Sequence, residues 1–401
     1  MFTIDNTTIS LSAVLLVMAL LTSLINPFFR KIGTSVASME PTTPEEEDED
    51  EESSSTQTAV ENISLPPVSI VFTPHDNASE LEKYLPLYFN QSYDSDFQVI
   101  VVMPQGDHET SDVLKRFADN KRLYTTFIPD SSRYMSRKKL AITLGVKAAK
   151  YPWVVMADIC SYPQSDRWLQ SLAQHCMKGR ELVVGYTRYE DGTPDYRVFE
   201  RYYEARYIMR EYQHDHAYRC PFNALMFRKD VFLRQEGFRG NLKYLRGEFD
   251  FMVNKYAHDD NLAFESSPEG TLIEEVPTDK VWLSKHLFYM ENRQHLRGSG
   301  RHRCLPVIDQ LALHGNYLLQ FAALAVSLLT HNWIITAASA LGILLTLVLR
   351  MVIGKRALNR FDIEISAWKV IPYELAIAWK KLGYKLKYRR ANKYDFISHK
   401  L

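Results

Sequence analysis

Two long apolar stretches, almost free of charged residues, interrupt the mixed pattern of this chain. The first spans residues 9–29, and the second spans residues 315–352 with a polar break at Thr330-His331-Asn332. About 20 apolar residues are needed to span the hydrocarbon core of a bilayer. The pattern predicts one transmembrane helix at 9–29 and two shorter ones within 315–352, joined by a tight turn. One long tilted helix over 315–352 is the alternative.

Basic residues beside these stretches predict their orientation. Arg30 and Lys31 follow the first stretch, and Lys and Arg flank the second on both sides. Because such residues concentrate in cytoplasmic flanks, we expect a multi-pass protein of the cell (inner) membrane. Residues 1–8 would lie outside, and the rest of the soluble chain, including the C-terminus, would be cytoplasmic. No Lys or Arg precedes the first stretch, as a cleaved signal peptide would require.

Between the membrane segments, short apolar runs alternate with helix-forming segments. The expected strands are 68–72, 98–103, 123–128 and 153–156, and the expected helices are 78–90, 110–120 and 137–150, with a further helix containing Trp168 and Leu169. Such alternation indicates a parallel sheet with helical crossovers. We therefore predict that residues 66–305 form an α/β domain of the doubly wound, nucleotide-binding type.

The remaining segments are polar or amphipathic. Residues 30–65 contain eight consecutive acids from Glu45 to Glu52, which predicts a disordered acidic linker. The formal net charge of the whole chain is zero, so the rest of the chain is basic. Residues 361–401 predict an interfacial amphipathic helix, broken near Pro372, and a basic tail that attracts anionic membrane lipids. Nucleic-acid binding is disfavoured because the tail adjoins a membrane segment. The four scattered cysteines indicate reduced thiols rather than disulfides or zinc.

One carboxylate has a position that favours ligand binding. Asp158 lies at the end of the predicted buried strand, two residues after Met156, and precedes a turn. Ligands of open α/β sheets bind outside the carboxyl ends of strands. Asp158 is therefore a candidate ligand of Mg²⁺ or Mn²⁺, with a simple turn-capping role as the alternative.

Six segments in order resemble family 2 glycosyltransferases of the GT-A fold, in their membrane-anchored bacterial form. They are Pro67–Asn77, Val99–Pro104, Asp158-Ile159-Cys160, Cys220–Lys229, Gly247–Asn254 and Phe288–His295. The resemblance covers most of residues 66–305. It implies a membrane-bound enzyme that transfers a sugar from a nucleotide sugar to a lipid-linked or cell-envelope glycan acceptor.

The resemblance also implies roles for individual residues. The nucleotide sugar would be bound by Thr73, Pro74, His75, Asn77, Lys139 and Asp158, with Asp158 also holding Mg²⁺ or Mn²⁺. Asp250 would be the base that deprotonates the acceptor hydroxyl, with Glu248 as the second candidate, and we expect only one of the two to face the pocket. Arg293 and His295 would bind the diphosphate, although juxtamembrane charge explains them equally well.

The sequence departs from the family pattern at four positions. Met103, Pro104, Cys160 and Phe249 stand where that family has carboxylates. The alternative function is therefore a catalytically inactive glycosyltransferase-like protein that serves as a partner or scaffold for envelope-glycan enzymes. A transporter is disfavoured, because three spans without an internal repeat provide no transport path. The aromatic-rich stretch 196–219 predicts a packed helix face, and His214 and His216 are expected to be polar loop residues.

Overall fold

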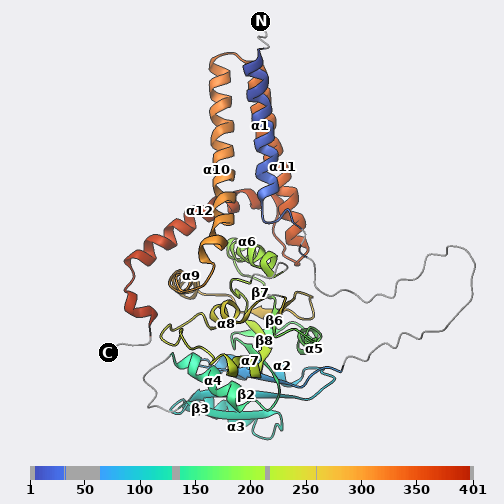
Figure 1. Ribbon diagram of the computed structural model, residues 1–401, viewed down its shortest axis with the longest axis vertical. Helices are drawn as coiled ribbons and strands as arrows, with labels where there is room; N and C mark the ends of the chain where they lie inside the picture. The colour runs from blue at the N-terminus through green and yellow to red at the C-terminus, as the bar shows by residue number, and fades with distance from the viewer. Residues whose placement is uncertain are drawn as a thin grey trace, which may run out of the picture.

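The computed structural model describes residues 5–30, 32, 64–128, 136–212, 217–258 and 260–397. A stalk of long helices rises from a mixed α/β domain (Figure 1). The acidic run Glu45–Glu52 and the polar loop with His214 and His216 lie outside the described residues, so those two predictions stay untested.

The domain is built on a seven-stranded sheet in the order β3-β2-β1-β4-β8-β6-β9. The strands are β1 (Val68–Phe72), β2 (Phe97–Pro104), β3 (Leu123–Ile128), β4 (Trp153–Ala157), β6 (Leu182–Gly185), β8 (Ala224–Arg228) and β9 (Leu262–Glu265). Strands β3, β2, β1 and β4 are parallel, and β8 runs antiparallel to both β4 and β6. The predicted α/β class and parallel half are therefore confirmed, while the antiparallel strand makes the whole sheet mixed.

A small second sheet and eight helices complete the described part of the domain. The sheet has the order β5-β10-β7, with β5 (Ser161–Pro163), β7 (Thr187–Tyr189) and β10 (Leu272–Glu274). The helices are α2 (Ala78–Phe89), α3 (His108–Arg116), α4 (Arg137–Ala148), α5 (Trp168–Ala173), α6 (Asp195–Tyr212), α7 (Lys229–Arg234), α8 (Glu248–Tyr256) and α9 (Asp279–Asn292). The first residue of each of the three predicted helices lies within two residues of the first residue of α2, α3 or α4.

Hydrophobic side chains pack on both faces of the sheet. In β1, Ile70 belongs to a core beneath α2 and α5, whereas Val71 belongs to a second core beneath α4. This division follows from the alternation of side chains along a strand. Helix α4 lies so close to β1 that a Cβ atom on Gly145 would be 2.5 Å from a Val71 methyl group. The glycine thus allows the helix that carries Lys138 to approach the sheet.

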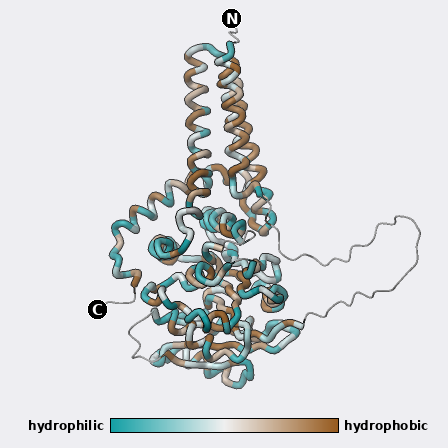
Figure 2. Tube along the Cα trace, in the orientation of Figure 1, coloured by the Kyte–Doolittle hydropathy of each residue, from teal (hydrophilic) through white to brown (hydrophobic). Residues whose placement is uncertain are grey.

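In the part of the chain that the structure describes, three helices are long and apolar enough to cross a membrane, namely α1 (Asn6–Ile25), α10 (Ser299–Leu329) and α11 (Trp333–Asn359). They lie side by side, and Figure 2 shows that most of their residues are hydrophobic. The predicted turn is present, so a single long helix over 315–352 is excluded. Helix α10 begins well before residue 315, because its polar first half adjoins the soluble domain. At the far end of the stalk the Asn332 amide donates to the Thr8 hydroxyl at 2.9 Å.

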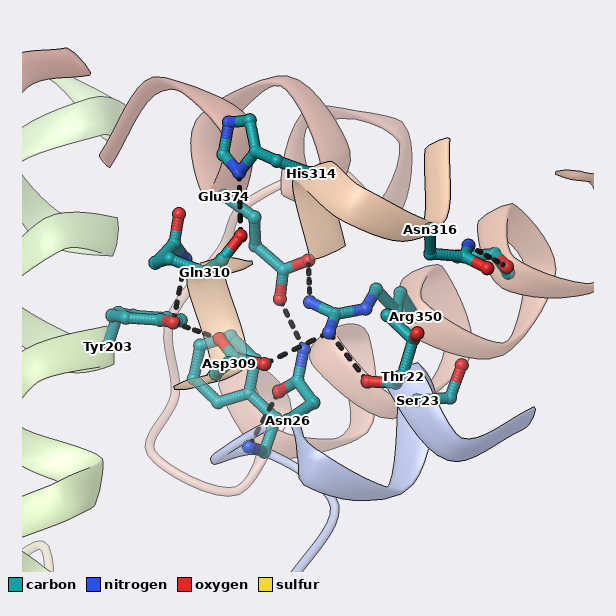
Figure 3. A network of polar contacts seen from close by, with 12 residues as sticks. Thr22, Ser23, Asn26, Tyr203, Asp309, Gln310, His314, Asn316, Arg350 and Glu374 are labelled. Carbon is teal, nitrogen blue, oxygen red and sulfur yellow. Dashed lines mark hydrogen bonds and ion pairs between the residues drawn. The ribbon is translucent and has the colours of Figure 1, made fainter. Parts of the chain in front are cut away.

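A buried polar network joins the base of the stalk to the domain (Figure 3). The guanidinium of Arg350 in α11 binds Asp309 of α10 at 3.0 Å and Glu374 of α12 (Ala367–Arg390) at 2.9 Å. It also donates to the Thr22 carbonyl of α1 at 2.6 Å. Asp309 accepts a hydrogen bond from Tyr203 of α6. One buried cation thus ties all three stalk helices to α12 and the domain.

The C-terminal segment differs from the prediction in two ways. Helix α12 continues through Pro372 without a break, because a proline in the second turn deprives only one carbonyl, that of Trp368, of its helical partner. Phe361, Ile363 and Ile365 lie in the hydrophobic core of the domain and not at a membrane interface. Apolar residues do remain exposed along α12, including Trp368 and Trp379. The chain described ends in a short 3₁₀ helix, η1 (Lys393–Phe396).

The aromatic residues of α6 form a packed face, as their helical spacing predicted. Phe199, Tyr202 and Tyr203 are buried. All three rings lie within 5.7 Å of the ring of Phe28, which follows α1. These aromatics therefore hold the first stalk helix against the domain.

Candidate active site

A cavity of about 230 Å³ opens beyond the end of β4, between the start of α8 and the helices α6 and α9. Its wall contains as many carboxylates as Lys and Arg side chains among the described residues. The acids are Asp158, Glu200, Glu204, Glu248 and Asp250, and the Lys and Arg residues are Lys138, Arg201, Arg219, Arg246 and Lys285. Such a dense mixture of charges in one concave site is typical of a ligand-binding centre.

Asp158 is held in place by the turn that ends β4. Its backbone N–H donates to the Asn223 carbonyl at 3.1 Å, and its side chain accepts a hydrogen bond from the Cys160 N–H at 3.1 Å. The second carboxylate oxygen lies 3.3 Å from the Lys138 ammonium. Burial alone would raise the pKa of Asp158, but Lys138 and the Cys160 N–H outweigh it and bring the pKa to about 2. Asp158 is thus a fixed anion in the cavity wall.

Lys138, and not Lys139, faces the cavity. The Lys138 ammonium lies 2.7 Å from Glu248 and therefore bridges two carboxylates. Adjacent residues of a helix point about 100° apart, and the Lys139 amine is buried behind the site. It donates to the Asn241 carbonyl at 2.9 Å and to the Tyr244 carbonyl. The expected nucleotide-sugar role of Lys139 is therefore corrected, because this lysine holds the 241–244 loop.

Glu248 and Asp250 both line the cavity, which differs from the expectation that only one would. They occupy the first turn of α8, and the cavity surrounds this helix end, so residues on different sides of it reach the same space. Glu248 turns to Lys138, while Asp250 turns to the 219–220 segment. Gly247 permits this arrangement, because its φ is +89° and a Cβ atom there would lie 2.2 Å from the Asn292 amide nitrogen.

The two acids of α8 have opposite electrostatic environments. Burial favours a neutral Glu248, but its ion pair with Lys138 outweighs this and lowers its pKa. Asp250 has weaker partners, since the Arg219 guanidinium is 3.8 Å away and the Cys220 N–H donates at 3.2 Å. Burial therefore raises the pKa of Asp250 to about 6. An acid with this pKa exchanges protons near neutral pH.

Several cations of the cavity were missed from the sequence. Arg201 of α6 and Lys285 of α9 both bind Glu274 of β10. Arg219 and Arg246 reach the wall from loops. These residues come from four distant segments without a shared motif, so no local signal identified them.

Arg293 and His295 lie outside this cavity, although a diphosphate role was expected for them. The His295 ring stacks on Tyr244 with 4.3 Å between centroids and lies 3.5 Å from Glu291. Arg293 is the C-cap of α9 and lines a different cavity. Both residues follow the last residue of α9, and neither lines the cavity that contains Asp158, so the structure does not bring the expected diphosphate residues to this site.

The loop after β1 lies beside the Asp158 turn rather than in the cavity wall. Because β1 and β4 are parallel neighbours, their carboxyl ends are adjacent. The Asn77 amide approaches the Cys160 sulfur at 3.6 Å. Thr73, Pro74 and His75 do not line the cavity, and the His75 side chain is 60% exposed. Asn77 thus links the loop predicted to bind the nucleotide to the Asp158 turn.

The capacity of the site for a metal rests on Asp158. Among the described residues no three His, Cys, Asp or Glu side chains converge on one point. Burial raises the pKa of the Cys160 thiol to about 12, so it stays neutral and is a poor ligand for a hard cation. The Asp158 carboxylate is ionised and 29% exposed. One such carboxylate fits Mg²⁺ or Mn²⁺ when substrate phosphates complete the coordination shell.

Solved structures of two glycosyltransferases are similar to this chain. The mannosyltransferase PcManGT from Pyrobaculum calidifontis, solved with GDP-Man and Mn²⁺, is 16% identical with a TM-score of 0.51 over 94% of this chain and 97% of that one. TarS 1–349 from S. aureus, solved with UDP-GlcNAc, is 9% identical with a TM-score of 0.40 over 81% of this chain and 92% of that one. No protein-family model matches this chain, and no curated protein matches it.

The similarity to the mannosyltransferase extends over nearly the whole of both chains. At this low identity it shows the fold, and the chain therefore has a glycosyltransferase fold of mixed α/β type combined with three apolar stalk helices. A fold alone does not determine a reaction, which has to be argued from the site.

Proposed function

We propose that this protein is a membrane-bound glycosyltransferase that transfers a sugar from a nucleotide sugar to a lipid-linked or cell-envelope glycan acceptor. The main support for this proposal is that Asp158 and Asp250 line one cavity and have opposite pKa shifts, to about 2 and about 6. Two carboxyl groups whose environments separate their pKa values are suited to different roles. Asp158 is the permanent anion, and Asp250 is the group that accepts a proton.

The donor binds at the carboxyl ends of β1 and β4 in this proposal. The loop with Thr73, Pro74, His75 and Asn77 borders the nucleotide, and Asp158 faces the phosphates. Mg²⁺ or Mn²⁺ held by Asp158 would neutralise charge on the departing diphosphate. Lys138 and Arg246 supply further positive charge from the cavity wall. The solved complex of the similar mannosyltransferase with GDP-Man and Mn²⁺ supports this class of donor and cofactor.

Asp250 accepts the proton of the acceptor hydroxyl. Its raised pKa places the carboxyl near the middle of its titration close to neutral pH, where a base is both available and strong enough. Arg219, 3.8 Å away, stabilises the ionised form before proton transfer. Glu248 is less suited to this role, because Lys138 binds it at 2.7 Å.

The stalk is proposed to cross the cell (inner) membrane with the α/β domain in the cytoplasm, where nucleotide sugars are available. Three observations support this orientation. The stalk surface is apolar, basic residues lie at its domain end, and the amide of Asn332 and the hydroxyl of Thr8 meet at its far end. Both ends of the α10–α11 hairpin then lie on the domain side.

A second function is favoured by one specific observation. The Lys138 ammonium occupies the position between Asp158 and Glu248 where a cation of the reaction would be expected. Met103, Pro104, Cys160 and Phe249 also stand in place of the carboxylates of similar enzymes. A protein that keeps the fold without catalysis and acts as a partner of envelope-glycan enzymes would have these features.

Calorimetry with the purified full chain separates the two functions. The titrants are UDP- and GDP-sugars, each with and without Mg²⁺ or Mn²⁺. Metal-dependent binding of at least one donor is the result expected for the transferase. A folded protein that binds none of them would favour the partner function instead.

A further inference from the structure

A second cavity of about 530 Å³ lies between α6, α9, α10 and α12, at the junction of the stalk and the domain. It shares Glu204, Arg219, His286 and Tyr289 with the candidate active site, so the two cavities adjoin. In Figure 1, α12 leaves the base of the stalk beside α10 and runs down beside α9, with which it is in contact. The second cavity therefore leads from the first toward the apolar stalk.

The charge of the second cavity differs from that of the first. Its wall has a single carboxylate, Glu204, against five Lys and Arg side chains, counting the described residues: Arg219, Arg293, Arg303, Lys381 and Lys385. Two of these bind Glu204, Lys381 at 3.2 Å and Arg219 at 3.9 Å. The surplus of positive charge matches an anion, whereas the first cavity has equal numbers of acids and Lys or Arg side chains.

Polar atoms in this wall lack partners within the described chain. The Nε–H groups of Arg219 and Arg293 are buried without a hydrogen-bond acceptor. Arg219 itself is 8% exposed, with its guanidinium stacked 3.8 Å from the centre of the Tyr289 ring. Buried donors of this kind are normally satisfied, and a bound ligand with oxygen acceptors would satisfy them.

The outer part of the same cavity is apolar. Val307 and Leu311 of α10 and Leu382 of α12 line this part. Their exposed fractions are 53%, 67% and 48%, respectively. The inner wall is polar, and Gln310 connects it through Tyr203 to the network around Arg350 (Figure 3). A ligand that fits both ends has an anionic head and a hydrocarbon chain.

We propose that the second cavity binds the phosphate and the first part of the hydrocarbon chain of a lipid-linked glycan acceptor. The phosphate lies against Arg219, Arg293 and Lys381, and the chain leaves between α10 and α12 into the membrane. The glycan then extends into the first cavity, with its hydroxyl at Asp250. This inference rests on the proposed function, because it selects the lipid-linked acceptor from the two acceptor classes.

Native mass spectrometry of the full chain in detergent tests this assignment. The probes are dodecyl phosphate, dodecanol and phosphatidylglycerol. We expect adducts with dodecyl phosphate but not with dodecanol, reduced about tenfold or more in Arg293→Gln and Lys381→Gln, because each loses a charge-assisted contact. The matched control Lys387→Gln, on the exposed side of the same helix α12, should bind as the parent protein does.

Two results would overturn the assignment. One is dodecyl phosphate binding that is unchanged in both variants. The other is phosphatidylglycerol binding of equal strength with the same sensitivity, which would make the cavity a site for ordinary membrane lipid. Val307→Trp tests the chain path without removing a charge, and it should also abolish the dodecyl phosphate adduct. Because no donor enters these measurements, a failure of donor binding in calorimetry would count against the proposed function and not against the lipid-phosphate site.

Discussion

At the scale of single residues, the candidate site depends on which neighbour each carboxylate has. Lys138 binds Asp158 and Glu248, while Asp250 is left with the more distant Arg219. Desolvation raises the pKa of all three acids, so the strength of the cationic partner decides the direction of each pKa shift. The division of roles between the acids follows from this asymmetry.

Replacement of the proposed base should remove catalysis without removing the donor. In Asp250→Asn we expect kcat to fall about 10²- to 10⁴-fold, the usual contribution of a general base, while calorimetry still detects the donor. In the parent protein kcat/KM should rise with pH through about 6, because only the ionised carboxylate accepts a proton and burial has raised its pKa to that value. Full activity of Asp250→Asn, or a flat profile through pH 6, would contradict the assignment.

Asp158 should determine the metal dependence of donor binding. In Asp158→Asn the neutral amide no longer attracts Mg²⁺ or Mn²⁺, so we expect donor affinity in the presence of metal to fall about tenfold or more. Removal of metal with EDTA should weaken donor binding to the parent protein but have little further effect on the variant. Cys160→Ser provides the matched control, since the neutral thiol is not proposed as a ligand. If metal strengthens donor binding to Asp158→Asn as much as to the parent protein, Asp158 is not the metal ligand.

At the scale of the element, the first turn of α8 is positioned by its backbone and by close packing on α9. Gly247 has a left-handed conformation and lies against Asn292, whose amide donates to the Arg246 carbonyl at 3.1 Å. A side chain at 247 would displace Asn292 and shift both acids of the turn. The geometry of the site therefore depends on a residue with no chemistry of its own.

Gly247→Ala should lower both stability and activity. The added Cβ atom would lie 2.2 Å from the Asn292 amide nitrogen, and the alanine backbone would have a positive φ that side chains disfavour. Together the two effects should lower the free energy of unfolding by about 1–3 kcal/mol. Gly179→Ala is the matched control, because Gly179 has a φ of +90° with open space around it. Thermal unfolding and kcat/KM should both fall further in Gly247→Ala than in the control. Equal losses in the two variants would show that the contact with Asn292 is unimportant.

At the scale of the whole molecule, Arg350 joins the stalk to the domain. It contacts Asp309, Glu374 and the Thr22 carbonyl, and each of its two acidic partners comes from a different helix. A buried ion pair that loses one partner leaves an uncompensated charge, whereas removal of all its charges together is often tolerated. The network thus makes the relative position of the helices depend on one cation.

Arg350→Met should destabilise the protein by about 3–5 kcal/mol, because Asp309 and Glu374 would remain buried together without a counter-charge. Thermal unfolding in detergent measures this effect. The triple variant Arg350→Met/Asp309→Asn/Glu374→Gln should recover much of the lost stability, since no buried charge remains. A triple variant as unstable as Arg350→Met would show that packing, rather than charge compensation, explains the loss.

The sequence by itself determined the elements whose formation depends on local pattern. Apolar runs and their periodicity were sufficient for β1 to β4, for α2 to α4 and for the existence of three apolar spans, because burial on a strand or a helix face has a fixed spacing. The position of Asp158 followed from the same reasoning. Asp250 came from the resemblance, as did the glycosyltransferase fold that the structural comparison supports.

Only the tertiary structure decided which side chains meet. The choice of Lys138 over Lys139 depends on how α4 is rotated on the sheet. Arg219 lines both cavities, whereas Arg293, at the C-cap of α9, lines only the second. Phe361 enters the core because α6 offers it an aromatic surface. The sequence likewise did not predict that α10 extends through polar residues or that α12 continues through Pro372. Contacts with the domain stabilise both helices where their local sequence disfavours a helix. Long-range packing sets these features, and it leaves no periodic trace in the sequence.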